Sequence, residues 1–93
     1  MINWFVTYSF NNKEDRDSFY AEISAAETGK LSRQEEGCAK YDYFFPAEDD
    51  TKLFLWEQWE NEEAIERHSK MPHFLNLRSI KEKYEVTTDI LKK

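Results

Sequence analysis

The chain has 93 residues, of which 40% are hydrophobic, 34% charged and 16% aromatic, and its net charge is −6 at pH 7. This length suits a single domain over residues 1–93, and the composition is that of a globular protein with a modest core. Because an acidic chain without a basic run lacks a concentrated positive patch, we expect neither nucleic acid nor a membrane as a partner.

The single cysteine, Cys38, excludes an intrachain disulfide framework. The first ten residues lack the basic and apolar segments of a signal peptide, and no apolar run approaches the roughly 20 residues that span a bilayer. A cytoplasmic location is therefore the default expectation. The aromatic residues are too many for so small an interior, which predicts an aromatic-lined cavity or a subunit interface.

The N-terminal third predicts a strand followed by a helix. Residues 2–10 alternate between two faces and are rich in β-branched and aromatic side chains, which is typical of a strand. Asn11 and Asn12 then offer a helix cap. The apolar positions that follow are spaced four and three apart, as on one helix face: Phe19, Ile23 and Ala26.

Two glycines interrupt the next stretch. Gly29 predicts a kink or break before Leu31, and Gly37 predicts the end of the helical region. Glu35 and Glu36 are unfavourably placed there, because the helix dipole disfavours negative charge near a C-terminus.

The second half predicts a hairpin, a split helix and a last strand. Residues 39–45 and 52–60 alternate as strands, and the intervening PAEDDT is typical of a turn. Asn61 caps a helix that continues through Ser69. Pro72 suits the first turn of another helix, whose apolar positions are Phe74, Leu77 and Ile80. Residues 84–91 predict the last strand.

The predicted order is β-α-β-β-α-β, with the second helix split. This is the ferredoxin-like arrangement of the α+β class, a four-stranded antiparallel sheet with helices on one face. The other face would be apolar and exposed. We therefore expect a homodimer, in which a two-fold axis stacks two sheets into a dimeric α/β barrel.

Both histidines of the chain, His68 and His73, fall within six positions. On a helix that begins near Asn61, His68 shares the face that points at the sheet. Each histidine has a structural interpretation, as a hydrogen-bonded core residue or as a capping or surface residue. Together with Trp59 and Phe74, they also suit a pocket for a small aromatic molecule.

Other kinds of site have weaker support. Glu57 shares a strand face with Trp59 and either orients a histidine or lies at the rim of the pocket. Two histidines five apart without a nearby cysteine disfavour a metal site, since zinc takes three or four protein ligands. Cys38 is expected to pack rather than to act as a nucleophile. A chain with two glycines lacks the glycine-rich loop that cradles nucleotide or flavin phosphates.

The segments EEGCAKYDYFF and LFLWEQWENEEAIERHSKMPHF resemble the antibiotic biosynthesis monooxygenase family of dimeric α/β-barrel proteins. The resemblance is strongest over residues 34–75 and fits the order of elements in nearly the whole chain. The positions that carry it are Glu35 or Glu36, Gly37, Cys38, Tyr41, Glu57, Trp59, His68, Pro72, His73 and Phe74.

This resemblance implies oxidation of a small phenol or quinol by O2 without a metal or any other cofactor. A deprotonated hydroquinone reduces O2 itself, so the protein need only bind it in a dry pocket and remove a proton. By analogy, His68 or His73 is the base. The candidates for contact with the substrate are Trp59, Phe74, Glu57, Tyr41 and Asn3.

Relatives with other activities leave alternatives open. One branch degrades haem with an Asn, a Trp and a His ligand, but His68 and Arg78 stand where the Trp and the His are expected, which disfavours haem. Another branch isomerises a small phosphorylated signalling sugar, for which Arg33, Lys40 or Arg78 could contact the phosphate. A non-catalytic ligand-binding or stress-related role is the remaining alternative.

Overall fold

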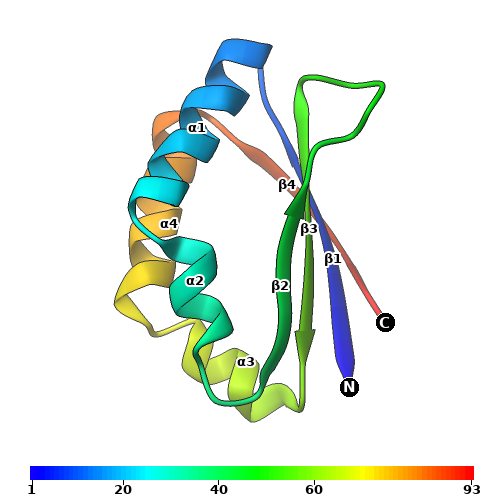
Figure 1. The fold of residues 1–93 in the computed structure, drawn as a ribbon, viewed down its shortest axis with the longest axis vertical. Coiled ribbons are helices and arrows are strands. Elements are labelled where there is room, and N and C mark those ends of the chain that lie inside the picture. The colour runs from blue at the N-terminus through cyan, green and yellow to red at the C-terminus, as the bar shows by residue number, and fades with distance from the viewer.

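The computed structural model describes residues 1–93 as one antiparallel sheet with all helices on one face (Figure 1). The strands are β1 (Ile2–Ser9), β2 (Cys38–Phe44), β3 (Lys52–Trp59) and β4 (Thr87–Lys92), in the order β2-β3-β1-β4. The helices are α1 (Lys13–Ala25), α2 (Thr28–Arg33), α3 (Glu62–His68) and α4 (Pro72–Lys83). The predicted ferredoxin-like fold is confirmed.

Alternation along the strands builds the core between sheet and helices. In β3 every second side chain is buried, because successive side chains of a strand point to opposite faces. Phe19 and Ile23 of α1 complete this layer from the helical side. The 12 buried apolar residues are Val6, Tyr8, Phe10, Phe19, Ile23, Tyr41, Leu53, Leu55, Trp59, Ala64, Leu77 and Ile80.

Asparagine side chains cap two helices as the sequence predicts. Oδ1 of Asn12 accepts a hydrogen bond from the backbone N–H of Asp15 at 2.8 Å, at the start of α1. Oδ1 of Asn61 accepts from the N–H of Ala64 at 3.0 Å, at the start of α3. Each cap satisfies one of the free N–H groups of a first turn.

The predicted break before Leu31 is present, but it does not lie at Gly29. The helix ends at Ala25 and restarts at Thr28, and Gly29 lies inside α2. Glu27 adopts the left-handed conformation with φ 57°, which a side chain rarely takes and which the sequence does not signal.

The last strand begins later than predicted. Residues 84–91 were expected to form it, but β4 begins at Thr87, because α4 ends in a Schellman motif. Glu85 takes the left-handed position with φ 52°, and the N–H of Val86 bonds to the carbonyl of Lys81 at 3.0 Å. An acid stands where glycine is usual, so the sequence gives no sign of this helix end.

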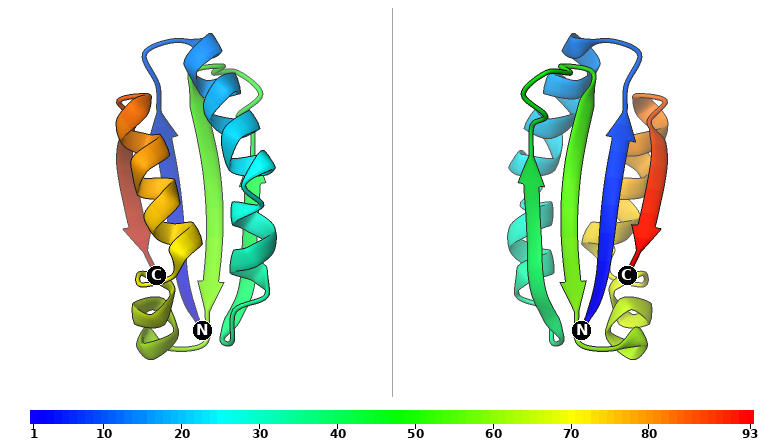
Figure 2. Two further views of the ribbon diagram at one scale, coloured as in Figure 1. Left: turned by 90° about the vertical axis from the view of Figure 1, so that its left-hand side faces the viewer. Right: turned by 90° about the vertical axis from the view of Figure 1, so that its right-hand side faces the viewer.

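No helix covers the second face of the sheet (Figure 2, right). Stacked and tilted aromatic rings lie on it, with Phe5 and Phe54 at a centroid distance of 6.3 Å and Phe5 and Trp56 at 5.8 Å. Phe44 and Leu91 on the same face are 47% and 57% exposed. None of the helices is both long and apolar enough to cross a membrane.

Candidate functional site

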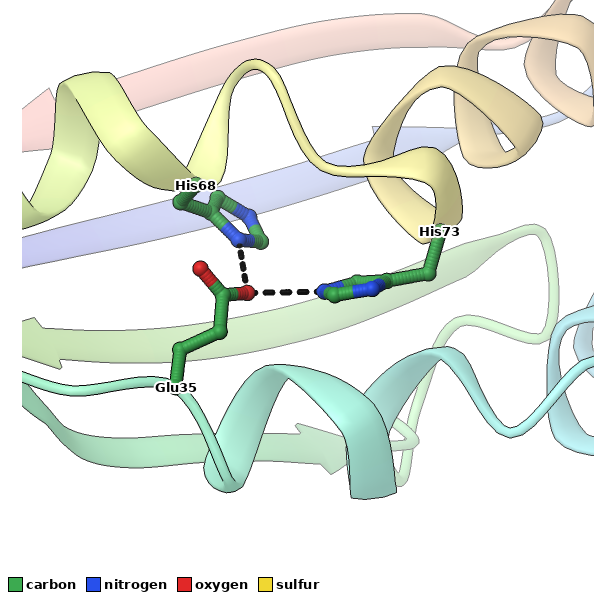
Figure 3. Close-up of side chains that lie close together, drawn as sticks. All are labelled: Glu35, His68 and His73. Atoms are coloured by element: carbon green, nitrogen blue, oxygen red, sulfur yellow. Dashed lines mark hydrogen bonds and ion pairs between the residues drawn. The ribbon is translucent and has the colours of Figure 1, made fainter.

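A single carboxylate oxygen joins both histidines. Oε2 of Glu35 lies 2.6 Å from Nδ1 of His68 and 2.7 Å from Nε2 of His73 (Figure 3). The Glu35 and His68 side chains are each 5% exposed, and the His73 side chain is 11% exposed. Because a carboxylate accepts hydrogen bonds, each imidazole donates through the nitrogen that faces Glu35.

Three segments of the chain bring these side chains together. Glu35 follows the end of α2, His68 is the last residue of α3, and His73 is the second residue of α4. On α3, Ala64 and His68 are both buried, since positions four apart share a helix face. Pro72 starts α4 at a position where its missing N–H has no cost, and this places His73 in the first turn.

Gly37 sets how closely the segment after α2 approaches α3. Its φ is +88°, in the left-handed region that favours glycine. A Cβ at this position would lie 2.6 Å from the Cβ of Ala64. The Gly37 carbonyl accepts a hydrogen bond from the N–H of Glu60 at 2.8 Å, which ties this turn to the end of β3.

Aromatic rings pack around His68. The distance between ring centroids is 4.7 Å to Trp59, 5.1 Å to Phe74 and 5.7 Å to Tyr41. Trp59 and Tyr41 are themselves buried, at 0% and 1% exposed. These contacts hold the imidazole in one orientation and keep water from most of its surface.

The surroundings of His68 favour its neutral form. Burial lowers its pKa below the usual 6.5, and the nearby His73 lowers it further, although the hydrogen bond and the charge of Glu35 act in the opposite direction. With Nδ1–H directed at Glu35, the lone pair of the neutral ring is on Nε2, on the side away from the carboxylate (Figure 3).

Glu57 is a second buried acid near His68. Burial raises the pKa of its carboxyl from 4.5 to about 7, and a hydrogen bond from Trp59 acts in the opposite direction. Nε1 of Trp59 donates this bond to Oε1 of Glu57 at 3.0 Å. Near pH 7 the carboxyl therefore exists in both its protonated and its ionised form.

An enclosed cavity of about 110 Å³ lies between the sheet, α3 and α4. Larger hollows of about 620 and 580 Å³ are open to solvent, and neither includes His68 or Glu57, so we assign the chemistry to the small cavity. Its lining is aromatic and aliphatic with few polar groups: Trp4, Val6, Tyr8, Tyr41, Glu57, His68, Phe74, Leu77, Arg78, Lys81, Thr88 and Ile90.

Two histidines and a carboxylate are also a common ligand set for a divalent metal ion. The ligand atoms of Glu35, His68 and His73 lie within 4.8 Å of one another, and Oε1 of Glu35 is buried without a hydrogen-bond partner. Ligand atoms around a shared ion lie about 3.0–3.4 Å apart, since each bond is about 2.1 Å long. The observed 2.6 and 2.7 Å are hydrogen-bond distances, so the three side chains would have to separate to admit an ion.

The structure brings most of the predicted site residues together. The cavity lining includes His68, Glu57, Tyr41 and Phe74. Trp59 does not line the cavity but packs behind His68.

Two predicted residues lie elsewhere. His73 meets the same oxygen of Glu35 from a second direction, with its ring centroid 5.9 Å from that of His68, and it does not line the cavity (Figure 3). Asn3 faces the uncovered side of the sheet, where its Oδ1 accepts hydrogen bonds from Nε1 of Trp56 at 2.9 Å and Nε2 of Gln58 at 3.1 Å. Neighbouring side chains of a strand point to opposite faces of the sheet, and Trp4 faces the cavity, so Asn3 faces away from it.

The role of Glu35 in orienting the histidines was not predicted from the sequence. Glu57 was a candidate for this role, but Glu35 performs it, and Glu57 bonds Trp59 instead. The unfavourable position of Glu35 after a helix end was the available signal, because a local rule is most often broken where a residue serves a site. Lys81 was also not expected in the cavity wall, and Arg78 was considered only as one of three possible phosphate contacts.

Cys38 lies near this group but is not activated. Burial, and then the charge of Glu35, raise the pKa of its thiol to about 11. Since the thiolate is the reactive form, this agrees with the expectation that Cys38 packs rather than acts as a nucleophile.

Parts of the chain are similar in sequence to two proteins of Bacillus subtilis. YjcS of Bacillus subtilis, an uncharacterised protein, is 38% identical over 47 residues, which are 50% of this chain and 44% of YjcS. YcnE of the same organism, provisionally named a monooxygenase, is 34% identical over 61 residues, which are 66% of this chain and 62% of YcnE. The matches thus span less than two thirds of either relative.

A solved structure of a conserved protein of unknown function from Bacteroides thetaiotaomicron is 27% identical, with a TM-score of 0.86. The superposition covers 99% of this chain and 94% of that one. The sequence profile described as "Antibiotic biosynthesis monooxygenase" matches residues 5–79, which include Glu35, Glu57 and both histidines. The chain therefore belongs to the antibiotic biosynthesis monooxygenase family.

Proposed function

We propose that the protein oxidises a small phenol or hydroquinone with O2 in the enclosed cavity, without a metal or another cofactor, and that His68 is the base. The observation that carries this proposal is the placement of His68, which lines the cavity while its Nδ1 is held by Glu35. Membership of the family supports the reaction class.

The reaction needs a base and a dry, confined space. Nε2 of His68 takes the proton of a substrate hydroxyl, and the imidazolium that forms is stabilised by the Glu35 carboxylate, as in other carboxylate–histidine pairs. The electron-rich phenolate then transfers electrons to O2. For a hydroquinone the balanced outcome is a hydroxylated quinone and one water: one oxygen atom enters the ring and the other leaves as water.

Other side chains have supporting roles in this proposal. Phe74 and Tyr41 form the apolar wall beside the ring of the substrate. Glu57, whose pKa of about 7 leaves it partly protonated, can donate a proton to a reduced oxygen species. His73 holds Glu35 in place and acts as a positioning residue rather than as the base.

The test is O2 consumption by purified, metal-stripped protein with hydroquinones, catechols and anthrone-like phenols. We expect turnover that His68→Ala abolishes, that Glu35→Gln lowers by roughly tenfold or more, and that the exposed-site control Glu63→Gln leaves unchanged. Circular dichroism of each variant separates loss of the base from loss of the fold. Uptake that survives in His68→Ala, or that appears only when Fe²⁺ is added, would contradict the proposal.

The same cavity also suits a protein that binds a small aromatic molecule without turnover, or an isomerase of a small signalling metabolite. Saturable binding of a phenol with no O2 uptake across the panel would favour the binding protein. Conversion of a phosphorylated sugar without O2 would favour the isomerase.

The functional unit in this proposal is a homodimer that works in the cytoplasm. The apolar, uncovered face of the sheet supports it, because a patch of this kind is costly to expose to water. A second copy related by a two-fold axis would cover the face with an identical one. The residues concerned are Phe5, Phe44, Phe54, Trp56 and Leu91.

A further inference from the structure

Two cations in the cavity wall have no acidic partner. Arg78 and Lys81 lie three positions apart on α4, and both line the cavity that contains His68. None of the ion pairs within 4.0 Å includes either of them, although acids outnumber bases in the chain by 19 to 13. Nζ of Lys81 lies 5.1 Å from the ring centroid of Tyr8.

Lys81 is not neutralised by an ion pair, although Glu57 acts on it from a distance. Burial lowers its pKa, and the positive charge of Arg78 lowers it further, while the attraction of Glu57 acts in the opposite direction. A half-buried ammonium next to a guanidinium is a site where an anion would be stabilised by both.

A buried hydroxyl lies at the same place. Oγ1 of Thr88, on β4, is buried and has no hydrogen-bond partner. Buried hydroxyl groups are almost always bonded, so this hydroxyl is available to bond a ligand at this place. Thr88, Arg78 and Lys81 line both the enclosed cavity and a surface hollow of about 370 Å³, and they therefore form the boundary between the two.

The remaining lining limits the charge of the ligand. Glu82 and Glu85 line the outer hollow but not the inner cavity. Their carboxylates would repel a polyanion such as a phosphate ester. A single carboxylate on the inner side meets the two cations and the hydroxyl, and Glu57, the one acid of the inner lining, is partly protonated near pH 7. A cavity of about 110 Å³ has room for a single aromatic ring.

We propose that Arg78, Lys81 and Thr88 bind the carboxylate of an aromatic hydroxy acid whose ring occupies the cavity beside His68. This assignment rests on the proposed function and narrows its substrate class from phenols in general to hydroquinone carboxylates. Arg78 and Lys81 donate charge-assisted hydrogen bonds to the carboxylate, and the Thr88 hydroxyl donates a third. The arrangement fixes which edge of the ring faces Nε2 of His68.

The test is calorimetric binding of a matched ligand pair under argon: 2,5-dihydroxybenzoate, and the neutral 2,5-dihydroxybenzamide of the same size. We expect the acid to bind roughly tenfold or more tightly than the amide. Lys81→Met and Arg78→Met should each remove most of this preference, and Thr88→Val should reduce it. Lys83→Met is the control, because it removes one positive charge from the same helix outside the cavity wall.

Equal affinity for acid and amide, no binding of the acid, or an equal loss in Lys81→Met and Lys83→Met would overturn the assignment. O2 uptake by the same samples in air separates it from the proposed function. Preference for the acid without O2 uptake would keep the carboxylate site and refute the oxygenase. Oxidation of neutral hydroquinones without any preference for the acid would keep the oxygenase and refute the site.

Discussion

Glu57 combines a buried carboxyl group with a single identified donor, the Trp59 N–H. It is 7% exposed, and burial raises its pKa from 4.5 to about 7. Between these pH values the folded protein binds this proton more tightly than the unfolded chain does. The contribution of Glu57 to stability therefore falls as the pH rises from 4.5 to 7, and it is lowest above pH 7.

Replacement of Glu57 by glutamine should remove this dependence. The amide keeps an oxygen for the Trp59 N–H and cannot ionise. We expect the free energy of unfolding of Glu57→Gln to match that of the wild type near pH 4.5. Above pH 7 it should be higher by about 3 kcal/mol, which is the free-energy equivalent of the pKa shift. Urea unfolding at several pH values measures the gap, with the exposed Glu63→Gln as control. A gap that does not change with pH would show that the charge of Glu57 is not responsible.

At the scale of single residues, helix and strand periods placed His68, Phe74, Tyr41 and Glu57 on inward faces. Periodicity decides which face a side chain occupies, and this is why these four came together as expected. The partner of His68 is 33 residues away in the sequence. That partner, Glu35, reaches His68 because the segment after α2 packs against α3, and no local sequence pattern encodes this contact.

At the scale of elements, the turn after α2 depends on Gly37. The left-handed φ of +88° and the 2.6 Å approach of a virtual Cβ to Ala64 both oppose any side chain. We expect Gly37→Ala to lower the free energy of unfolding by roughly 3 kcal/mol, from backbone strain and overpacking together. Chemical denaturation measures this loss.

Two further variants separate these causes. Gly37→Ala with Ala64→Gly removes the steric contact but keeps the backbone strain, so it should recover part of the loss. Gly29→Ala is the matched control: Gly29 lies in a helix, and its virtual Cβ meets the flexible end of Arg33 at 3.0 Å. It should stay within about 1 kcal/mol of the wild type. A Gly29→Ala variant as unstable as Gly37→Ala would contradict this account.

The elements that the sequence predicts well are those with strong local signals. Asn12 and Asn61 cap helices, and Pro72 begins one, because each supplies or lacks a specific hydrogen-bonding group. The two misplaced boundaries both involve a glutamate in the left-handed conformation, at Glu27 and Glu85. Tertiary packing imposes that conformation against residue preference, and so the sequence does not reveal it.

At the scale of the whole molecule, the uncovered sheet face predicts the oligomeric state. A charge placed among its aromatic rings should prevent a second sheet from packing there, because burying an unpaired carboxylate is costly. We expect a dimeric wild type and a monomeric, folded Phe54→Asp variant in sedimentation analysis. Leu75→Asp is the control, since Leu75 is an apolar residue on α4, away from the uncovered sheet face, and is 48% exposed. A wild type that sediments as a monomer would refute the dimer.

The contact between Trp59 and His68, 4.7 Å between ring centroids, gives the protein an optical signal of its own. An imidazolium quenches the fluorescence of an indole in contact with it, whereas a neutral imidazole quenches far less. In a variant with Trp4→Phe and Trp56→Phe, Trp59 is the one remaining indole. Its emission should fall as the pH drops below 6.5, because burial lowers the pKa of His68. Replacement of His68 should abolish that decrease. The fluorescence of Trp59 would therefore measure the protonation state of His68 without any substrate.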